Sequence, residues 1–203
     1  MLPSTLNYLS TGKQFNQYVG SLPSMITQLE FDEDFNQPVD ELPASLKYLK
    51  FGCKFNQRVD KLPPLVGLCF GTEFNQCVDK LPSTLTYLKF GNRFNQHVDK
   101  LPATLECLEF GEDFNQRVDH LPTSLRQLKF GYHFNQDITA LPETIVQLSL
   151  GHDFGQQVRK LPTMLTYLTI YIGYNLAKIK PMLSKNKITY DRTHRPSYSG
   201  GIR

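Results

Sequence analysis

The side chains that could do chemistry are few, and each occupies a fixed place in a repeating pattern. Cys77 lies 20 residues before His97, and Arg58 and Arg117 continue the same series. Nearby basic groups lower the pKa of a thiol, and a Cys–His pair can serve as nucleophile and base. The sequence therefore leaves two interpretations of Cys77 and His97 open: a catalytic pair, or variable surface residues.

A second candidate is His133, which has Asp113 and Asp153 20 residues away on either side, with His152 next to Asp153. A metal site needs three or four converging ligands, so we predict a ladder of alternating charge here and no metal. We expect His133 to be charged between the two carboxylates. The four cysteines show no C-x-x-C spacing and are predicted to be free thiols in a reducing compartment; they are Cys53, Cys69, Cys77 and Cys107.

The remaining motifs of common enzymes are missing from the sequence. It contains no glycine-rich phosphate loop, no nucleophile elbow and no H-E-x-x-H pattern. We predict that the protein is not an enzyme and uses no cofactor. No run approaches 18 apolar residues, so no membrane span is expected, and the N-terminus lacks the features of a secretory signal.

These residues are positioned by an internal repeat. Leu-Pro recurs every 20 residues, with one step of 19 between Leu62 and Leu81, and the aligned unit reads L-P-x-x-L-x-x-L-x-F-G-x-x-F-N-Q-x-V-D-x. Counting the first Leu as position 1, all 14 phenylalanines fall at positions 10 and 14. Such a period indicates a solenoid, in which stacked units bury one continuous core.

One unit can be read physically from residues 81–100. Leu88 and Phe90 alternate with Tyr87 and Lys89, which is typical of a strand with one buried face. Gly91 then permits a turn, and Pro102 prevents a helix across the next junction. The predicted fold is an all-β or β-rich solenoid of 20-residue coils, with a parallel sheet and one short strand per repeat. We predict strands near residues 8–10, 28–31, 48–51, 68–70, 87–90, 107–110, 127–130, 147–150 and 167–170.

Residues at the same position of successive repeats form columns if the coils stack, and the charged and amide columns support stacking in register. Position 13 alternates in sign from Asp34 through Lys54 to Asp153, which avoids like charges about 4.8 Å apart. The position-15 asparagines are predicted to form a structural ladder, in which each side chain hydrogen-bonds to backbone groups at the corner and to the amide of the next coil. The glutamines that follow them are predicted to be solvated corner residues. The asparagines of the ladder are Asn36, Asn56, Asn75, Asn95, Asn115 and Asn135, with Asn16 before them.

The recurring unit resembles the FNIP repeat, a variant of leucine-rich repeats known from social amoebae and giant viruses. The resemblance covers about residues 2–170, although the signature reads Phe-Asn-Gln-x-Val here and only Gln37-Pro38-Val39 keeps a nearby proline. It implies a role in protein interaction. Family members often carry an N-terminal F-box; this chain begins within the first repeat, so we expect no F-box.

The repeats and the ends predict three segments. Residues 1–170 hold eight full repeats and one partial repeat, 171–191 form a C-terminal cap, and 192–203 form a flexible basic tail. Within the cap, Asn175 is expected to begin a short helix with Ile179, Met182 and Leu183 on one face, followed by a strand at 188–190. Residues 176–203 carry a net charge of +6, against −3 for the remainder of the chain.

The predicted function is a non-catalytic scaffold that binds a protein partner through the outward face of the strand sheet. Outward positions 7 and 9 vary between copies, whereas inward positions 8 and 10 are nearly uniform. The predicted binding residues are Tyr8, Glu30, Tyr48, Lys50, Tyr87, Lys89, Glu109, Lys129 and Tyr167. Two alternatives stay open: a nucleic-acid or acidic-surface binder acting through the basic tail, and an enzyme using Cys77 and His97. We expect a monomer in the cytoplasm, or in the host cytoplasm if the protein is viral, without nucleic-acid binding.

Overall fold

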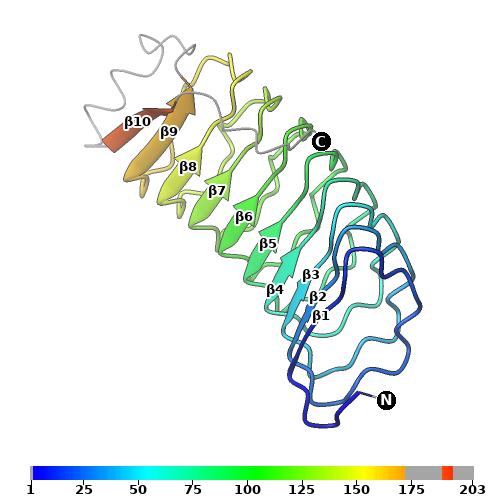
Figure 1. The fold of residues 1–203 in the computed structure, drawn as a ribbon. Coiled ribbons are helices and arrows are strands. Elements are labelled where there is room, and N and C mark those ends of the chain that lie inside the picture. The colour runs from blue at the N-terminus through cyan, green and yellow to red at the C-terminus, as the bar shows by residue number, and fades with distance from the viewer. Residues whose placement is uncertain (1, 172–188, 194–203) are drawn as a thin grey trace.

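The fold is one parallel sheet built from a stack of similar coils. The computed structural model describes residues 2–171 and 189–193. Ten strands lie in the order β1 to β10, each hydrogen-bonded to the next (Figure 1). They are β1 Tyr8–Ser10, β2 Gln28–Glu30, β3 Tyr48–Lys50, β4 Gly67–Cys69, β5 Tyr87–Lys89, β6 Cys107–Glu109, β7 Gln127–Lys129, β8 Gln147–Ser149, β9 Tyr167–Tyr171 and β10 Thr189–Thr193. The predicted solenoid, with one short parallel strand per repeat, is confirmed.

The strands pair in the register that the sequence repeat dictates. Equivalent residues face each other, as in the pairing of Leu88 with Leu108. Leu88 and Phe90 are buried, while Tyr87 is half-buried and Lys89 is exposed. Most strands end at position 9 of the repeat, one residue earlier than the predicted end at position 10. That residue still bonds the next coil, since the Phe90 N–H donates to the carbonyl of Glu109 at 2.9 Å.

Two columns of phenylalanine rings run along the core. Within one coil Phe90 and Phe94 stack with ring centroids 3.7 Å apart. Phe94 also stacks on Phe74 and Phe114 of the neighbouring coils, at 6.1 Å in each case. Leucines and valines of the repeat complete the buried cluster. Because each coil buries its apolar residues only against its neighbours, stacking is what creates the core.

The turns after β3 to β8 contain a glycine at position 11, where successive coils approach closely, whereas β2 is followed by Asp32. A Cβ added at Gly91 would lie 1.9 Å from the carbonyl oxygen of Gly71. The same clash with preceding backbone recurs at position 11 of most later coils. At Gly12, in the first coil, nothing lies within 4 Å of such a Cβ.

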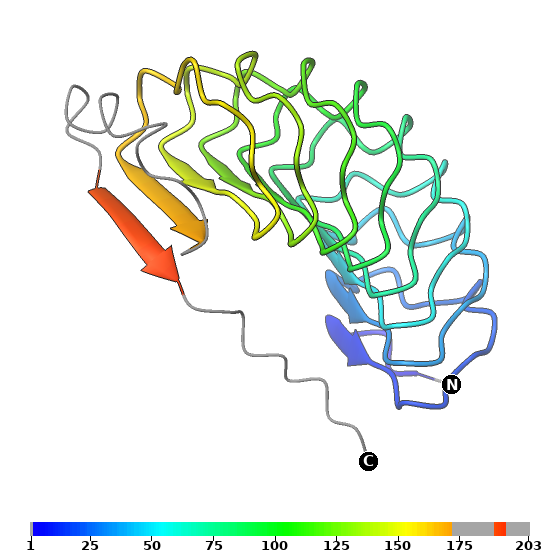
Figure 2. The same ribbon diagram turned by 90° about the horizontal axis from the view of Figure 1, so that it is seen from above.

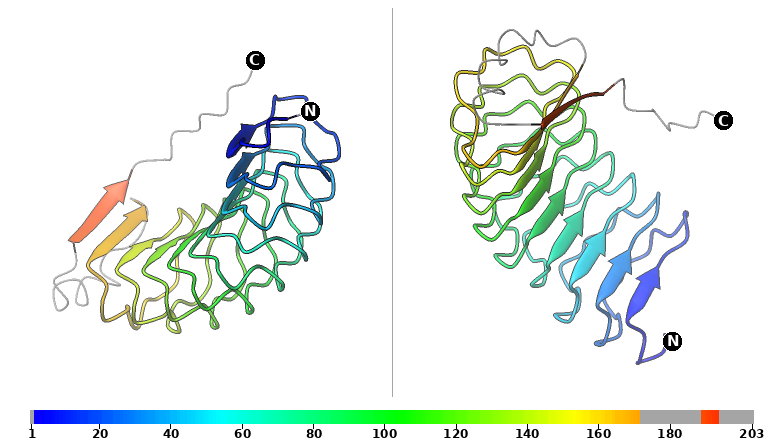
Figure 3. Two further views of the ribbon diagram at one scale, coloured as in Figure 1. Left: turned by 90° about the horizontal axis from the view of Figure 1, so that it is seen from below. Right: turned by 90° about the vertical axis from the view of Figure 1, so that its left-hand side faces the viewer.

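The coils stack in an arc, and the strands line its inner side (Figures 2 and 3). The side chains at positions 7 and 9 therefore project from the sheet into the concave side of the arc. No helix within residues 2–171 or 189–193 is long and apolar enough to cross a membrane.

Of the elements predicted for the C-terminal cap, only the last strand falls within the described residues. The predicted cap helix at 175–183 lies outside the described residues. β10 pairs in parallel with β9, with Thr189 opposite Tyr167 and Thr193 opposite Tyr171. This strand covers two of the residues predicted at 188–190 and extends through residue 193, inside the segment predicted as tail.

Candidate protein-interaction surface

We define the sheet face as the outward side chains at positions 7 and 9 of β1 to β9. Three of the predicted binding tyrosines are among the large apolar side chains exposed in the structure: Tyr8, Tyr48 and Tyr167. Tyr87 is half-buried, and its hydroxyl donates a hydrogen bond to Glu109 Oε1 at 3.3 Å. The strands thus place aromatic rings on one concave side of the molecule.

The charged residues of the sheet face form ion pairs between neighbouring strands. Lys50 Nζ lies 3.2 Å from Glu30 Oε2, and Lys89 Nζ lies 3.2 Å from Glu109 Oε2. Lys129 is exposed in the same column. Since these side chains are substantially exposed, each pair adds little to stability, and their groups stay accessible to a partner.

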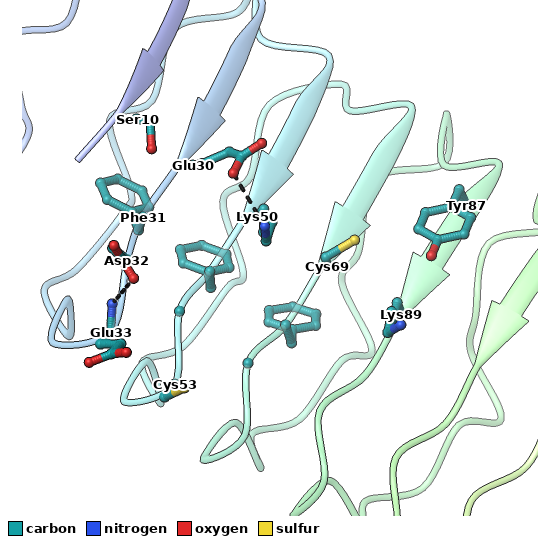
Figure 4. Close-up of a pocket in the computed structure, with 14 residues that line it drawn as sticks. Ser10, Glu30, Phe31, Asp32, Glu33, Lys50, Cys53, Cys69, Tyr87 and Lys89 are labelled. Carbon is teal, nitrogen blue, oxygen red and sulfur yellow. Dashed lines mark hydrogen bonds and ion pairs between the residues drawn. The ribbon is translucent and has the colours of Figure 1, made fainter. Parts of the chain in front are cut away.

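A hollow of about 590 Å3 opens on the sheet face and the adjoining turns (Figure 4). Its lining includes Glu30, Lys50, Cys69, Tyr87 and Lys89. A second hollow, of about 190 Å3, lies over Gly67 between Tyr48 and Tyr87. The larger volume falls within the range of small-molecule pockets. Four of the predicted binding residues line the larger hollow: Glu30, Lys50, Tyr87 and Lys89.

The thiols of Cys69 and Cys107 and the hydroxyl of Tyr87 have pKa values raised above their ordinary values, which favours their neutral forms. Burial raises the pKa of the Cys69 thiol, although Lys89 and Lys50 oppose that shift. Burial, and then Glu109, raises the pKa of Cys107. Burial also raises the pKa of the Tyr87 hydroxyl. A thiol must ionise to act as a nucleophile, so Cys69 and Cys107 are poorly placed for covalent chemistry.

The structure does not bring Cys77 and His97 together as a catalytic pair. Cys77 is exposed, and no hydrogen bond links it to His97 in the described part of the chain. The pKa of the nearby Asp79 is lowered mainly by Lys100 and less by Cys77. Neither Cys77 nor His97 lines the hollows on the sheet face.

His133 contacts one of its two predicted carboxylate neighbours. Its Nδ1 lies 2.7 Å from Asp153 Oδ2, and His152 Nδ1 lies 2.9 Å from Asp153 Oδ1. The His152 ring also stacks on Tyr132, with centroids 4.5 Å apart. Hydrogen bonds from His152 and His133 lower the pKa of Asp153. The described residues contain no cluster of three or more His, Cys, Asp or Glu side chains arranged to hold a metal ion.

The repeated asparagines link each coil to the next. Asn95 Oδ1 accepts a hydrogen bond from the backbone N–H of Asn115 at 2.9 Å, and a second from Gln116 Nε2 at 3.0 Å. The same pair of bonds recurs from Asn16 to Asn135, where Gly155 supplies the backbone donor. The prediction that the glutamines are only solvated corner residues is wrong. Their invariance at position 16 was the signal that could have shown their part in the ladder.

The other columns form ion pairs between or within coils. At position 13 Lys54 Nζ lies 2.7 Å from Asp34 Oδ1, in agreement with the alternation of sign. The like-signed aspartates at position 19 pair instead with basic residues at positions 17 and 20, as Asp79 does with Lys100 at 2.8 Å. The pairs between coils, such as Lys54 with Asp34 and Lys100 with Asp79, add contacts that favour stacking in register.

Comparison with known proteins places these features in a family. The model of the FNIP Repeat family matches residues 18–54, 74–113, 94–132 and 114–153, which together make up more than half of the chain. A solved structure from a giant virus, described as "CroV588 a novel circular LRR protein structure", is 38% identical with a TM-score of 0.70. The match covers 86% of this chain and 31% of that protein, so the chain spans under a third of its length. No curated protein matches the sequence.

Proposed function

The chain belongs to the FNIP repeat family, and on that premise we propose that it is a non-catalytic scaffold whose sheet face binds a protein partner. The observation that carries the proposal is the contrast within each strand. The inward leucine is the same in every copy and buried in nearly all of them, whereas the outward side chains on either side of it differ from coil to coil. A fixed frame with a varied face is what recognition of a heterogeneous surface requires.

The composition of the face supports the same proposal. Exposed tyrosines provide a large contact area at low conformational cost, and they are enriched at binding surfaces. The hollow of about 590 Å3 adds a concave feature that a partner side chain could enter. A cytoplasmic location and a monomeric state complete the proposal, since a free concave face does not require a second copy of the chain.

The test is partner capture with matched variants. The protein is used as bait in an extract of its native host, and retained proteins are identified by mass spectrometry. We expect a partner that binds the wild type and is lost from the double variant Tyr48→Ala, Tyr87→Ala. The control is Tyr18→Ala, which removes a tyrosine of comparable exposure, 56% against 51% for Tyr48, from outside the sheet face.

The outcome separates the proposed surface from its alternatives. All variants must keep the circular dichroism spectrum of the wild type. If the double variant captures the partner as well as the wild type does, the sheet face is not the binding surface. A further variant truncated after Thr193, where β10 ends, then tests whether the C-terminal residues beyond the sheet bind instead.

A further inference from the structure

A gap interrupts the side chains of the sheet face at β4. The outward residues of β4 are Gly67 and Cys69, while β3 and β5 each present a tyrosine and a lysine at the same positions. The missing side-chain volume produces the hollow of about 190 Å3. We call this hollow the β4 recess; it is lined by Gln28, Leu29, Glu30, Tyr48, Leu49, Lys50, Gly67, Cys69 and Tyr87.

The two tyrosines make the walls of the β4 recess. The ring of Tyr48 leans over Gly67, so that a Cβ added at Gly67 would lie 2.8 Å from Tyr48 Cδ1. Tyr48 is 51% exposed and can swing aside, whereas Tyr87 is half-buried and held through its hydroxyl. A flat ring entering the recess can therefore pack against tyrosine faces, a contact worth about 0.5–1.5 kcal/mol beyond its buried area.

The charges around the β4 recess are arranged symmetrically about Cys69. Along position 9 the strands β2 to β6 present Glu30, Lys50, Cys69, Lys89 and Glu109. Each lysine is paired with the glutamate on its outer side, at 3.2 Å. A group placed over Cys69 therefore has an ammonium on the strand at each side (Figure 4), and a carboxylate there is attracted while a cation is repelled.

The acidic residues at the β2 end of the larger hollow are already engaged. Glu33 Oε1 is 3.2 Å from Lys13 Nζ, and Asp32 Oδ1 accepts the backbone N–H of Glu33 at 2.8 Å. Glu30 is the partner of Lys50. The Cys69 thiol is neutral, because burial raises its pKa. Lys50 and Lys89 are the charged side chains opposite Cys69 on the two adjacent strands, so the space between them is the part of the recess that favours an anion.

We propose that the β4 recess anchors an acidic segment of the protein partner, taking an aromatic ring over Gly67 and a neighbouring carboxylate over Cys69. This inference rests on the proposed function, since the segment belongs to the partner of the sheet face. Gly67 and Cys69 are two residues apart on one strand, or about 6.5 Å, so one small ligand that carries a ring and a carboxylate can approach both positions.

The probe is N-acetylphenylalanine, which carries both groups, compared with its neutral amide. Each is titrated into the 15N-labelled full chain, followed by NMR. We expect saturable shifts of the Gly67 and Cys69 amide signals with the acid. The amide should bind about tenfold more weakly, since it loses two exposed charge pairs of up to about 1 kcal/mol each. Raised salt should weaken binding of the acid alone.

Three variants identify the site. Gly67→Gln fills the recess with the residue that β2, β7 and β8 carry at this position, and binding should be lost. Lys89→Gln removes one ammonium without filling the recess, and the preference for the acid should fall about threefold. Lys80→Gln removes an exposed lysine at a corner outside the sheet face, and it should bind both probes as the wild type does.

Two results would overturn the proposal: equal affinity for the acid and the amide, or unchanged binding of the acid in Gly67→Gln. If Gly67→Gln does not fold, Lys89→Gln alone decides, and an unchanged preference for the acid rejects the site. The proposed function fails differently. If the double variant Tyr48→Ala, Tyr87→Ala still captures the partner, the sheet face is rejected as the binding surface. If capture depends on these tyrosines but the probe does not bind, only the proposed anion site is rejected.

Discussion

At the scale of single residues, the close approach of stacked coils restricts which side chain a position can hold. Position 11 shows this most clearly, because the coil before it fills the space that a side chain would need. A Cβ at Gly91 would lie 1.9 Å from one backbone atom of Gly71 and 2.3 Å from another. Backbone cannot swing aside as a side-chain tip can, so the stack itself must yield.

The close approach gives a prediction with an internal control. Gly91→Ala should lower the free energy of unfolding by about 1–3 kcal/mol, the usual cost of overpacking. Gly12→Ala changes the same repeat position where nothing lies within 4 Å, and it should stay within about 0.5 kcal/mol of the wild type. Urea denaturation measures both. An equal loss in the two variants would show that the effect is local conformation and not stacking.

Asp153 gives a prediction for pH dependence. Hydrogen bonds from His152 and His133 lower its pKa below the ordinary value of 3.8. A group with a lowered folded-state pKa stabilises the fold above its unfolded-state pKa, and this contribution is lost as pH falls through the lowered value. Asp153→Asn should therefore cost stability at pH 6, and the difference from the wild type should vanish in strong acid.

The control for this titration is Asp113→Asn. Asp113 lies two coils away in the same column and forms no ion pair within the described residues. Unfolding of both variants by urea is followed between pH 2 and pH 7. A penalty for Asp153→Asn that stays constant across this range would contradict a role for its ionised carboxylate.

At the scale of the element, each coil is a strand, a turn and an extended return, and the second to seventh coils each contain a stacked phenylalanine pair. The position-10 and position-14 rings stack within the coil at 3.6 to 3.7 Å and between coils at 5.6 to 6.4 Å. The core is thus continuous along the array. The free energy of unfolding lost when one ring is removed should therefore depend on how many neighbouring rings it contacts.

Comparison of a central ring with a terminal ring tests this dependence. Phe94 is fully buried between two neighbours, whereas Phe15 in the first coil is partly buried and stacks on Phe35 alone among the described rings. Phe94→Ala should cost about 3–5 kcal/mol, and Phe15→Ala clearly less. Denaturant midpoints measure both. A loss for Phe94→Ala within about 0.5 kcal/mol of zero would show that this ring is not part of the core.

The sequence predicts the strand and the buried face of each coil, but it does not predict the contacts between surface side chains. The alternation of Leu88 and Phe90 with Tyr87 and Lys89 predicts the strand, its direction and its buried face, because these follow from the repeat. The pairing of Cys77 with His97 was not found, because equivalent positions in neighbouring coils need not bring two exposed side chains into hydrogen-bond contact. The β4 recess could not be foreseen either, since it depends on how Tyr48 leans over Gly67.

At the scale of the whole molecule, the array is an arc whose stability is distributed unevenly. In a linear stack each coil is stabilised by its immediate neighbours. The strand β5 pairs with β4 and β6, whereas β1 pairs with β2 alone. Leu9 is only partly buried, while the equivalent Leu88 is fully buried. The first coil should therefore open more often than the central ones.

Amide hydrogen exchange measures this gradient directly. We expect stronger protection in β5 than in β1, with the central strands exchanging near the free energy of global unfolding. Uniform protection from β1 to β5 would indicate that the stack unfolds as one unit. Partner binding along the sheet face should raise protection in the strands that it contacts.

The central claim is that a partner docks on the sheet face. Site-specific photo-crosslinking tests it most directly, with a benzophenone amino acid placed at Tyr48 on the sheet face or at Tyr18 outside it. The two side chains are 51% and 56% exposed, so unspecific capture should be equal. We predict that, in the presence of the partner, the probe at Tyr48 crosslinks to it and the probe at Tyr18 does not. Crosslinks from Tyr18 with none from Tyr48 would contradict the account.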